Sequence, residues 1–280
     1  MKIIQTPQEM SAFSAQMRRE NKKIALVPTM GALHEGHLSL IDIAKKNSDI
    51  TVVSIFVNPT QFGPNEDFSA YPRQLEEDAK ACEGRGVDVV FAPLASSIYK
   101  KDASTCVVEE EISANLCGKS RPTHFRGVTT VVAILFNIVK PDVAVFGEKD
   151  AQQVSVIKRM VRDLFMDVEI IRAPLVRQEN GLALSSRNKY LHGMQLETAC
   201  RLSESLKVGK AMVEEGCRNI DRVKAAIVNS LAKSSRIRVI YVEIVDAETS
   251  LPVKELVPGK CRAAIAVWLD QTRLIDNMVL

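Results

Sequence analysis

The chain has 280 residues, of which 46% are hydrophobic and 25% are charged, and its formal net charge is +3. This length allows a substantial buried core. The small net charge argues against nucleic acid as the main partner but leaves room for a small anion at a local positive site. No apolar stretch approaches the roughly 20 residues that cross a bilayer. Because the six cysteines include no C-x-x-C pair and the first residues lack a long apolar run, we expect a cytoplasmic protein with reduced thiols and no membrane partner.

Short apolar runs alternate with helical patterns over most of the chain's first part. The predicted strands cover residues 24–28, 51–57, 87–93, 143–147 and 168–174, and the predicted helices cover residues 37–46, 74–85, 128–139 and 151–164. The runs are rich in β-branched residues and do not alternate with polar ones, which is typical of parallel strands buried on both faces. The sequence therefore predicts a doubly wound α/β sheet, which binds ligands beyond the carboxyl ends of its strands.

A different pattern follows the polar stretch at residues 177–191. Amphipathic helices are predicted at residues 196–215 and 220–232, and strands at residues 238–245 and 263–269. This indicates a smaller α+β unit after the parallel sheet. We therefore expect two domains, which cover residues 1–176 and 177–280.

Two of the four histidines, His34 and His37, stand just after the first predicted strand in the stretch PTMGALHEGH. A helix starting near Gly36 would offer unpaired backbone N–H groups and a partial positive charge, which together favour a phosphate. Gly31 and Gly36 would let the backbone approach a base or a phosphate closely. The spacing is equally compatible with two solvated histidines in a turn, whereas a zinc site lacks a third ligand at a familiar spacing.

Two further stretches place phosphate-binding side chains after predicted strands. In VFGEKDAQQ, Lys149 is a point charge suited to phosphate, and Asp150 could accept from a ribose hydroxyl or help to hold Mg²⁺. In GLALSSRN, two serines and Arg187 could bind phosphates from a loop that contains Gly181. Taken alone, E-K-D is more often a solvated helix start, and S-S-R is more often part of an ordinary loop.

Two other stretches carry polar residues that could meet a substrate. In FVNPTQFGPNEDF, Gln61 offers both a donor and an acceptor to a polar, uncharged group. In THFRGVTTVV, His124 and Arg126 could contact substrate from a lid or could lie on the surface. Both stretches also suit a plain loop or a helix start.

The stretches PTMGALHEGH, FVNPTQF, HFRGV, FGEKDAQQ and GLALSSRN together resemble the pantothenate synthetase family, in the same order and over almost the whole chain. HEGH and LSSRN are similar to the paired H-I-G-H and K-M-S-K-S motifs of the wider nucleotidyltransferase superfamily. Leu184 stands where that superfamily has methionine, and we expect this apolar exchange of similar volume to be tolerated. The resemblance implies a Rossmann-like N-terminal domain, a smaller C-terminal domain, a homodimer and a cytoplasmic location.

The resemblance also implies an activity: the ATP-dependent joining of pantoate to β-alanine through an enzyme-bound pantoyl adenylate, with release of AMP and pyrophosphate and with Mg²⁺ as cofactor. The implied catalytic residues are His37, His34 and Lys149, with His37 as proton donor. The implied ATP-binding residues are Met30, Gly31, His34, His37, Gly147, Glu148, Lys149, Asp150, Val176, Leu184, Ser185, Ser186 and Arg187. The implied contacts with pantoate or β-alanine are Gln61, Gln153 and Asn58, and the resemblance assigns no residue as a resident metal ligand.

Two other functions remain open to the same residues. A nucleotidyltransferase of the cytidylyltransferase kind would use HEGH in the same way but keep the nucleotidyl group in its product. A metal-stabilised binding protein would use the histidine pair as ligands. Release of AMP separates the first alternative from a ligase, and stoichiometric zinc in purified protein would support the second.

Overall fold

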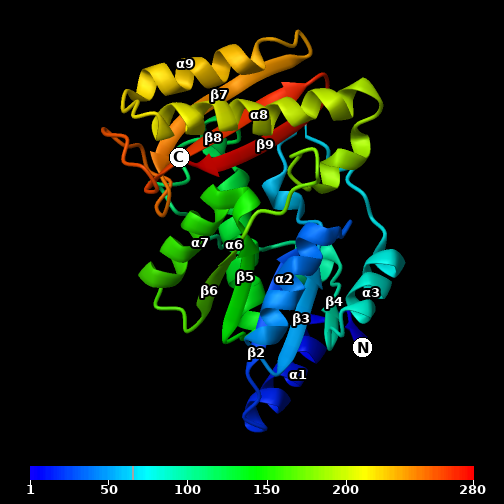
Figure 1. The fold of residues 1–280 in the computed structure, drawn as a ribbon. Helices are drawn as coiled ribbons and strands as arrows, with labels where there is room; N and C mark the ends of the chain where they lie inside the picture. The colour runs from blue at the N-terminus through cyan, green and yellow to red at the C-terminus, as the bar shows by residue number, and fades with distance from the viewer. Residues whose placement is uncertain (65) are drawn as a thin grey trace. The chain divides into compact units, whose positions relative to one another are not determined.

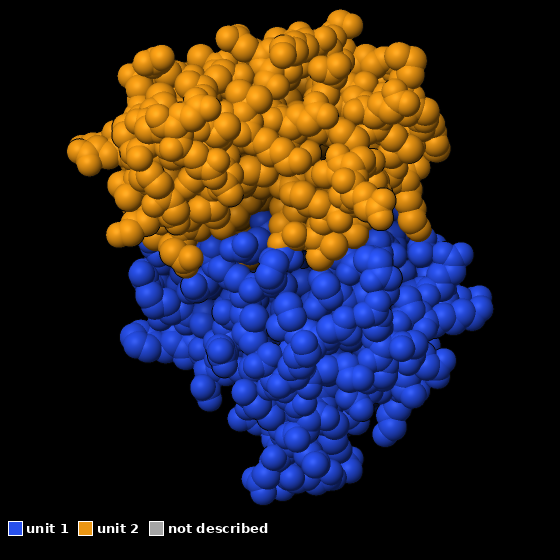
Figure 2. Space-filling view, in the orientation of Figure 1, with its two compact units in different colours: residues 1–110, 121–148, 156–174 blue, residues 111–120, 149–155, 175–280 orange. Residues whose placement is uncertain are grey.

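The computed structural model describes residues 1–64 and 66–280, and its contacts divide the chain into two compact units (Figure 2). The first unit comprises residues 1–110, 121–148 and 156–174, and the second comprises residues 111–120, 149–155 and 175–280. Within the described residues, no helix has both the length and the apolar character needed to span a membrane. The expected domain boundary between residues 176 and 177 stays a prediction.

In the described part of the first unit, the strands form a six-stranded parallel sheet with the order β1-β4-β3-β2-β5-β6. The strands are β1 (Lys2–Ile4), β2 (Ile24–Thr29), β3 (Ile50–Ile55), β4 (Val89–Phe91), β5 (Val143–Gly147) and β6 (Glu169–Ala173). The strand order reverses between β2 and β5, so the carboxyl ends of these two neighbours form the switch point at which such sheets bind ligands. The structure thus confirms the predicted α/β class.

Helices cover the sheet because each presents one apolar face. The helical segments are α1 (Pro7–Arg19), α2 (Glu35–Lys46), the 3-10 turn η1 (Pro59–Gln61), α3 (Leu75–Gly84), α4 (Ala95–Ile98), α6 (His124–Val139) and α7 (Ala151–Asp163), whose first turn is assigned to the second unit. Leu40 and Ile41 of α2 pack with Ala25 and Val27 of β2 in one buried cluster, and α2 lies along β2 and β5 in Figure 1. This packing fixes where α2 begins, directly after the turn that leaves β2.

In the described part of the second unit, a three-stranded antiparallel sheet is packed against two helices (Figure 1). Its elements are α5 (Cys117–Ser120), the 3-10 turn η3 (Ser186–Tyr190), α8 (Met194–Glu214), α9 (Ile220–Leu231), β7 (Ile237–Asp246), β8 (Cys261–Leu269) and β9 (Thr272–Val279). Leu206 of α8, Ile227 of α9 and Ile265 of β8 are fully buried in one core. The smaller α+β unit is therefore confirmed.

The sequence prediction missed several elements and misplaced some ends. Strand β1, helix α1 and strand β9 were not predicted, and helix α6 begins at His124 rather than at residue 128. Strand β1 is a three-residue edge strand, too short for a periodic signal. In β9 the polar residues Asp276 and Asn277 are buried, so the strand shows no simple alternation of apolar and polar positions.

Candidate active site

The turn that leaves β2 is held by a buried carboxylate from α3. Asp78 is 1% exposed and accepts hydrogen bonds from the backbone N–H groups of Ala32 (2.9 Å) and Leu33 (2.8 Å). Gly31 has φ +84°, and a Cβ there would lie 2.9 Å from Asp78 Oδ2, while Ala32 itself has φ +51°. A non-glycine residue in this region is strained unless its surroundings fix it, so Asp78 determines the path of the chain from Met30 to the histidines.

His34 and His37 form a reciprocal cap at the start of α2. His34 Nδ1 accepts from the Gly36 N–H (3.2 Å), His37 Nδ1 accepts from the His34 N–H (3.3 Å), and the ring centroids lie 4.1 Å apart. A backbone N–H can only donate, so each Nδ1 uses its lone pair, and the proton of each neutral ring lies on Nε2. The cap therefore fixes the tautomer of both histidines.

The start of α2 lies close to the expected position, but its capping differs from the expectation. The helix begins at Glu35, with His34 as its N-cap. The expected unpaired N–H groups at Gly36 and His37 are already bonded, to the His34 ring and to the His34 carbonyl (2.7 Å) respectively. The physical reason is that an imidazole can replace the usual Ser, Thr, Asp or Asn cap. Two backbone N–H groups at this helix end are thus already bonded within the turn.

Gln61 is oriented by its buried neighbour Asn58. Asn58 Nδ2 donates to Gln61 Oε1 and to the Gly127 carbonyl, each at 3.1 Å, and its Oδ1 accepts from the Tyr99 hydroxyl at 2.9 Å. With its Oε1 turned to Asn58, Gln61 directs Nε2 to Met30 Sδ at 3.1 Å. Asn58 is 1% exposed and uses both of its amide hydrogens within the protein, so it contributes to the site through Gln61, and its direct contact with substrate stays a prediction.

His124 of the THFRGV stretch and the preceding Arg121 clamp the backbone of Gln61. The Gln61 carbonyl accepts from Arg121 Nη2 (3.1 Å) and from His124 Nδ1 (2.9 Å), and Arg121 also makes a two-pronged ion pair with Glu66 (2.6 and 2.5 Å). A Cβ on Gly127 would lie 2.5 Å from the carbonyl oxygen of residue 60, so this close helix-to-loop packing requires glycine.

The pKa of Glu66 is consistent with its ion pair to Arg121. Burial acts to raise the pKa of Glu66, but the hydrogen bonds and charge of Arg121 outweigh it and hold that pKa below its ordinary value. Glu66 thus stays ionised at neutral pH and keeps Arg121 aimed at the Gln61 carbonyl. Of the two roles considered for His124 and Arg126, the structure gives His124 a positioning contact and leaves Arg126 exposed on α6.

The residues that follow β5 combine charge with exposure. Gly147 ends the strand, and residues 148–150 form the 3-10 turn η2 (Glu148–Asp150). Lys149 Nζ lies 3.7 Å from Asp150 Oδ2, with the two side chains 22% and 48% exposed, and Glu148 lies 3.8 Å from Arg172. The charges of Lys149 and Asp150 are thus partly accessible to solvent, and their contact with phosphates stays a prediction.

The two glutamines at the start of α7 have different surroundings. Gln152 is 7% exposed, accepts from the Cys117 N–H at 3.0 Å, and donates to the carbonyls of Ile112 (2.9 Å) and Asn115 (2.7 Å). It is therefore a structural residue that ties α7 to the segment before α5. Gln153 is half-buried, which leaves it as the glutamine predicted to hold pantoate.

Residues 176–184 form a hydrogen-bonded hairpin that leads into the serines. The Leu184 N–H donates to the Val176 carbonyl (3.0 Å), Arg177 pairs with Ala183, and Gly181 turns the chain with φ +86°. Ser185 then caps η3, its Oγ accepting from the Arg187 N–H at 3.3 Å. Ser185, Ser186 and Arg187 thus lie in one continuous segment, in which Ser186 is buried and the other two are half-buried.

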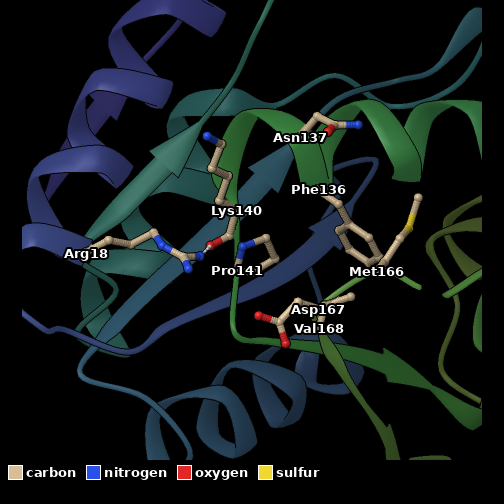
Figure 3. Close-up of a pocket in the computed structure, with 8 residues that line it drawn as sticks. All are labelled: Arg18, Phe136, Asn137, Lys140, Pro141, Met166, Asp167 and Val168. Carbon is tan, nitrogen blue, oxygen red and sulfur yellow. Dashed lines mark hydrogen bonds between the residues drawn. The ribbon is translucent and has the colours of Figure 1, made fainter. Parts of the chain in front are cut away.

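A cavity of about 330 Å³ lies at the amino ends of strands in the parallel sheet, opposite to their carboxyl ends (Figure 3). It lies where α6 ends and where β5 and β6 begin, and Arg18 Nη1 donates there to the Lys140 carbonyl at 3.1 Å. None of the predicted site residues lines it. Since parallel sheets bind ligands at the carboxyl ends of their strands, this cavity at the amino ends does not bear on the predicted substrates.

Comparison with known proteins decides the family. A family model described as pantoate-beta-alanine ligase matches residues 2–279. The chain belongs to the pantoate-beta-alanine ligase family. Members of this family are enzymes that form an amide bond, so the resemblance inferred from five short motifs is confirmed over nearly the full length of the sequence.

Individual proteins similar to this chain support the family assignment over its whole length. The pantothenate synthetases of Thermotoga neapolitana and Pseudothermotoga lettingae are 53% and 54% identical over 280 residues, which cover 100% of this chain and 100% and 99% of theirs. The crystal structure of pantothenate synthetase from Thermus thermophilus has a TM-score of 0.93 and 41% identity, with 100% of this chain and 99% of that chain covered. The pantoate-beta-alanine ligase from Francisella tularensis, solved in complex with beta-gamma ATP and beta-alanine, has a TM-score of 0.82 and 36% identity, with 100% and 97% covered.

Sequence reasoning missed several residues that hold the predicted site segments of each unit in place. In the first unit, hydrogen bonds hold turns in place through the side chains of Asp78, Tyr99 and Glu66. In the second unit, the same is done by Asp276 and Asn277. The only local signal for Asp78 was its place in a helix, where acidic residues are common for electrostatic reasons alone. Their partners lie 41 to 55 residues away for the first three, so no spacing pattern could reveal them.

Proposed function

We propose that this chain joins pantoate to β-alanine with the use of ATP, through an enzyme-bound pantoyl adenylate, and releases AMP and pyrophosphate. The observation that carries this proposal is the family match over residues 2–279, taken together with a capped histidine pair after β2, a strand at the sheet's switch point. We also infer a Rossmann-like use of this sheet, in which the nucleotide lies across the ends of β2 and β5.

The chemistry sets what the residues must do. In the first step a carboxylate oxygen of pantoate forms a bond to the α-phosphorus of ATP, and the bond from that phosphorus to pyrophosphate breaks. In the second step the neutral amine of β-alanine forms the amide bond to the acyl carbon, AMP leaves with its electron pair, and the amine loses a proton. Two anions meet in the first step, so the main requirements are positive, preorganised groups and correct alignment.

The histidine pair suits the first requirement. Because Nδ1 of each ring accepts a backbone hydrogen bond, the donor that His34 and His37 offer is Nε2–H. Such a donor is already oriented before the reaction and stabilises negative charge on phosphate oxygens without reorganisation. In this role His37 supplies its strongest hydrogen bond in the transition state.

Gln61 suits the recognition of pantoate. Its Oε1 is committed to Asn58, and one Nε2 hydrogen is directed to Met30, so the second Nε2 hydrogen is offered to an oxygen of the substrate. Pantoate carries carboxylate and hydroxyl oxygens that accept such a bond. Gln153, half-buried at the start of α7, is the second proposed contact with pantoate.

We assign the ATP phosphates to Lys149 and to the segment from Leu184 to Arg187, which includes Ser185 and Ser186. Val176 is proposed to contact the adenine side through its backbone, and Gly147 and Glu148 complete the nucleotide site. Arg187 adds a planar fork that matches phosphate geometry, and Lys149 adds a point charge. These donors neutralise the charge that builds up as pyrophosphate departs.

Mg²⁺ fits this site as a companion of ATP. Within residues 1–64 and 66–280, no three His, Cys, Asp or Glu side chains cluster as a metal cage, and Mg²⁺ commonly uses one or two carboxylates together with substrate phosphates. Asp150, with a side chain 48% exposed, is the residue that would hold it. When bound, the ion would screen the charge of the phosphates.

The chain's assembly and location are proposed on the resemblance to the family. We infer a homodimer in the cytoplasm, with reduced thiols. Burial and the charge of Asp78 raise the pKa of the Cys82 thiol to about 12, which supports an inert, reduced cysteine at that position. Light scattering of the purified protein measures the mass of the assembly, and a monomer mass at micromolar concentration would contradict the homodimer.

The adenylate route is tested by following oxygen. Pantoate labelled with ¹⁸O in both carboxylate oxygens is incubated with ATP, Mg²⁺ and β-alanine, and the products are analysed by mass spectrometry. An adenylate intermediate transfers one ¹⁸O to AMP and leaves one in the amide carbonyl of pantothenate. Label in inorganic phosphate together with ADP would indicate an acyl phosphate, and a product that keeps the nucleotidyl group would indicate a nucleotidyltransferase; either result would contradict the proposal.

A further inference from the structure

Strand β9 carries two adjacent buried polar residues in the core of the second unit. Asp276 is 3% exposed and Asn277 is 6% exposed, and Arg262 of the neighbouring strand β8 is 4% exposed. Buried charges and amides are costly unless they are paired, so the partners of these residues indicate what they are for. Adjacent side chains of a strand point to opposite faces, which lets Asp276 and Asn277 serve two different segments.

Asn277 holds the backbone of Lys149. Its Nδ2 donates to the Lys149 carbonyl at 3.1 Å, and its Oδ1 accepts from Arg262 Nη1. In the β8–β9 register Ala264 faces Asn277, which puts Arg262 in the diagonal position on the same face. Arg262 thus fixes the Asn277 amide so that its nitrogen, not its oxygen, faces the Lys149 carbonyl.

Asp276 holds the hairpin that leads to Arg187. Its two carboxylate oxygens accept from Arg177 Nη1 (2.7 Å) and Nη2 (2.9 Å). Arg177 Nη1 also donates to the Gly181 carbonyl (3.0 Å), and its Nη2 donates to the Asn277 carbonyl (3.1 Å). A two-pronged ion pair of this kind fixes both distance and direction, so the hairpin is attached to β9 at the residue next to the one that holds Lys149.

We propose that Asp276 and Asn277 are positioning residues for ATP, because they set the spacing between Lys149 and the segment that carries Ser185 and Arg187. The inference rests on the proposed function, which assigns those residues to the phosphates. One strand then supports both groups of phosphate donors, and a shift in either residue changes the fit of the triphosphate more than the fit of pantoate.

The sharpest test is Asn277→Asp, which keeps the volume and the acceptor for Arg262 but replaces the donor to the Lys149 carbonyl with an oxygen. We expect the KM for ATP, and the Kd for the non-reacting analogue α,β-methylene-ATP, to rise about 5- to 20-fold, while the KM for pantoate changes less than two-fold. In hydrogen exchange measured by mass spectrometry, peptides that cover residues 147–155 should exchange faster. Asp276→Asn should also raise the KM for ATP, with faster exchange confined to residues 176–187.

The matched control is Ile265→Val, which lies directly opposite Asp276 in β8 and removes one buried methyl group without touching the polar network. It should lower the Tm and leave the KM for ATP unchanged. The proposal is overturned if Asn277→Asp and Asp276→Asn keep a wild-type KM for ATP, or if they raise the KM values for ATP and pantoate equally with a loss of Tm like that of Ile265→Val. If one variant does not fold, the other decides by the same criteria.

The wild-type protein separates this inference from the proposed function. Wild-type protein that forms no pantothenate and binds no α,β-methylene-ATP would contradict the proposed function itself. Wild-type protein that does both, beside variants with unchanged ATP affinity, would contradict only the role of Asp276 and Asn277.

Discussion

The region around Gln61 in the first unit and the region around Lys149 in the second unit are built in different ways. Gln61 is 9% exposed and its side chain is oriented by another neutral amide, Asn58. The Lys149 side chain is 22% exposed and carries a full charge, and its support from Asn277 reaches only the backbone. In the proposed function, the first region selects a substrate by fixed hydrogen-bond geometry, whereas the second attracts phosphates by charge and leaves the cation side chain able to adjust.

This difference predicts how each region fails. A buried amide that loses its partner leaves an unpaired polar group, which weakens binding of the substrate that matched it. An exposed cation that is removed weakens the electrostatic stabilisation of a charged transition state, and its effect is screened by salt. The histidine pair belongs to the first unit, but its proposed role is to stabilise negative charge, so its loss should affect the rate more than the affinity for pantoate.

The largest expected effect is that of His37→Ala. It removes the Nε2 donor proposed to act chiefly in the transition state, so we expect kcat to fall about 10²-fold or more, with folding intact. The measurement is steady-state turnover with saturating ATP and pantoate. His37→Asn is the matched control, since its side-chain oxygen can still accept from the His34 N–H; turnover near the wild-type value in His37→Asn would show that the Nε2 donor is not used.

The next effect is that of Lys149→Ala. It should slow adenylate formation about 10- to 100-fold, since a hydrogen bond to a charged group contributes about 1.5–3 kcal/mol, and it should affect the amine step much less because pyrophosphate departs only in the first step. The measurement compares turnover from ATP and pantoate with turnover from presynthesised pantoyl adenylate. If the presynthesised adenylate does not restore product formation, Lys149 acts elsewhere or holds structure.

A smaller effect is expected for Gln61→Ala, with Gln153→Ala as its companion. Each should weaken pantoate binding by about 1–3 kcal/mol, because a substrate oxygen is left without its donor in a closed site. Calorimetric titrations with pantoate and with α,β-methylene-ATP separate the two ligands. An equal loss of affinity for both would contradict the division of labour between the two regions.

The smallest effect concerns the Glu66–Arg121 pair. The pKa of Glu66 is held below its ordinary value of 4.5 by Arg121, so its stabilising contribution is fully present above that ordinary value and is lost as the pH falls through the lower native pKa. The free energy of unfolding of the wild type and of Glu66→Gln, measured from pH 7 to pH 3, should differ by about 1 kcal/mol or less at neutral pH. The difference should shrink below pH 4.5; a difference that grows on acidification would contradict the assigned cause.

The parallel sheet and the position of the histidines could be predicted from the sequence because both depend on local patterns. Apolar β-branched runs marked the strands, and the histidines followed one of them directly. The start of α2 was placed to within one or two residues, but its cap was missed, because His34 takes a role that Ser or Asp usually fills. The residues that hold the site segments in place could not be predicted, because their hydrogen-bond partners are distant in the sequence. Asp78 accepts from a backbone N–H 46 positions away, and Asn277 donates to a carbonyl 128 positions away.

The central claim is that pantoate is adenylated before β-alanine takes part, and isotope exchange tests it most directly. Labelled pyrophosphate is incubated with the enzyme, ATP, Mg²⁺ and pantoate, and each component is then omitted in turn. Because a reversible first step needs only these reactants, the account predicts that label enters ATP when pantoate is present and β-alanine is absent, and that no exchange occurs without pantoate. Exchange that requires β-alanine, or no exchange under any condition in an enzyme that still makes pantothenate, would contradict the account.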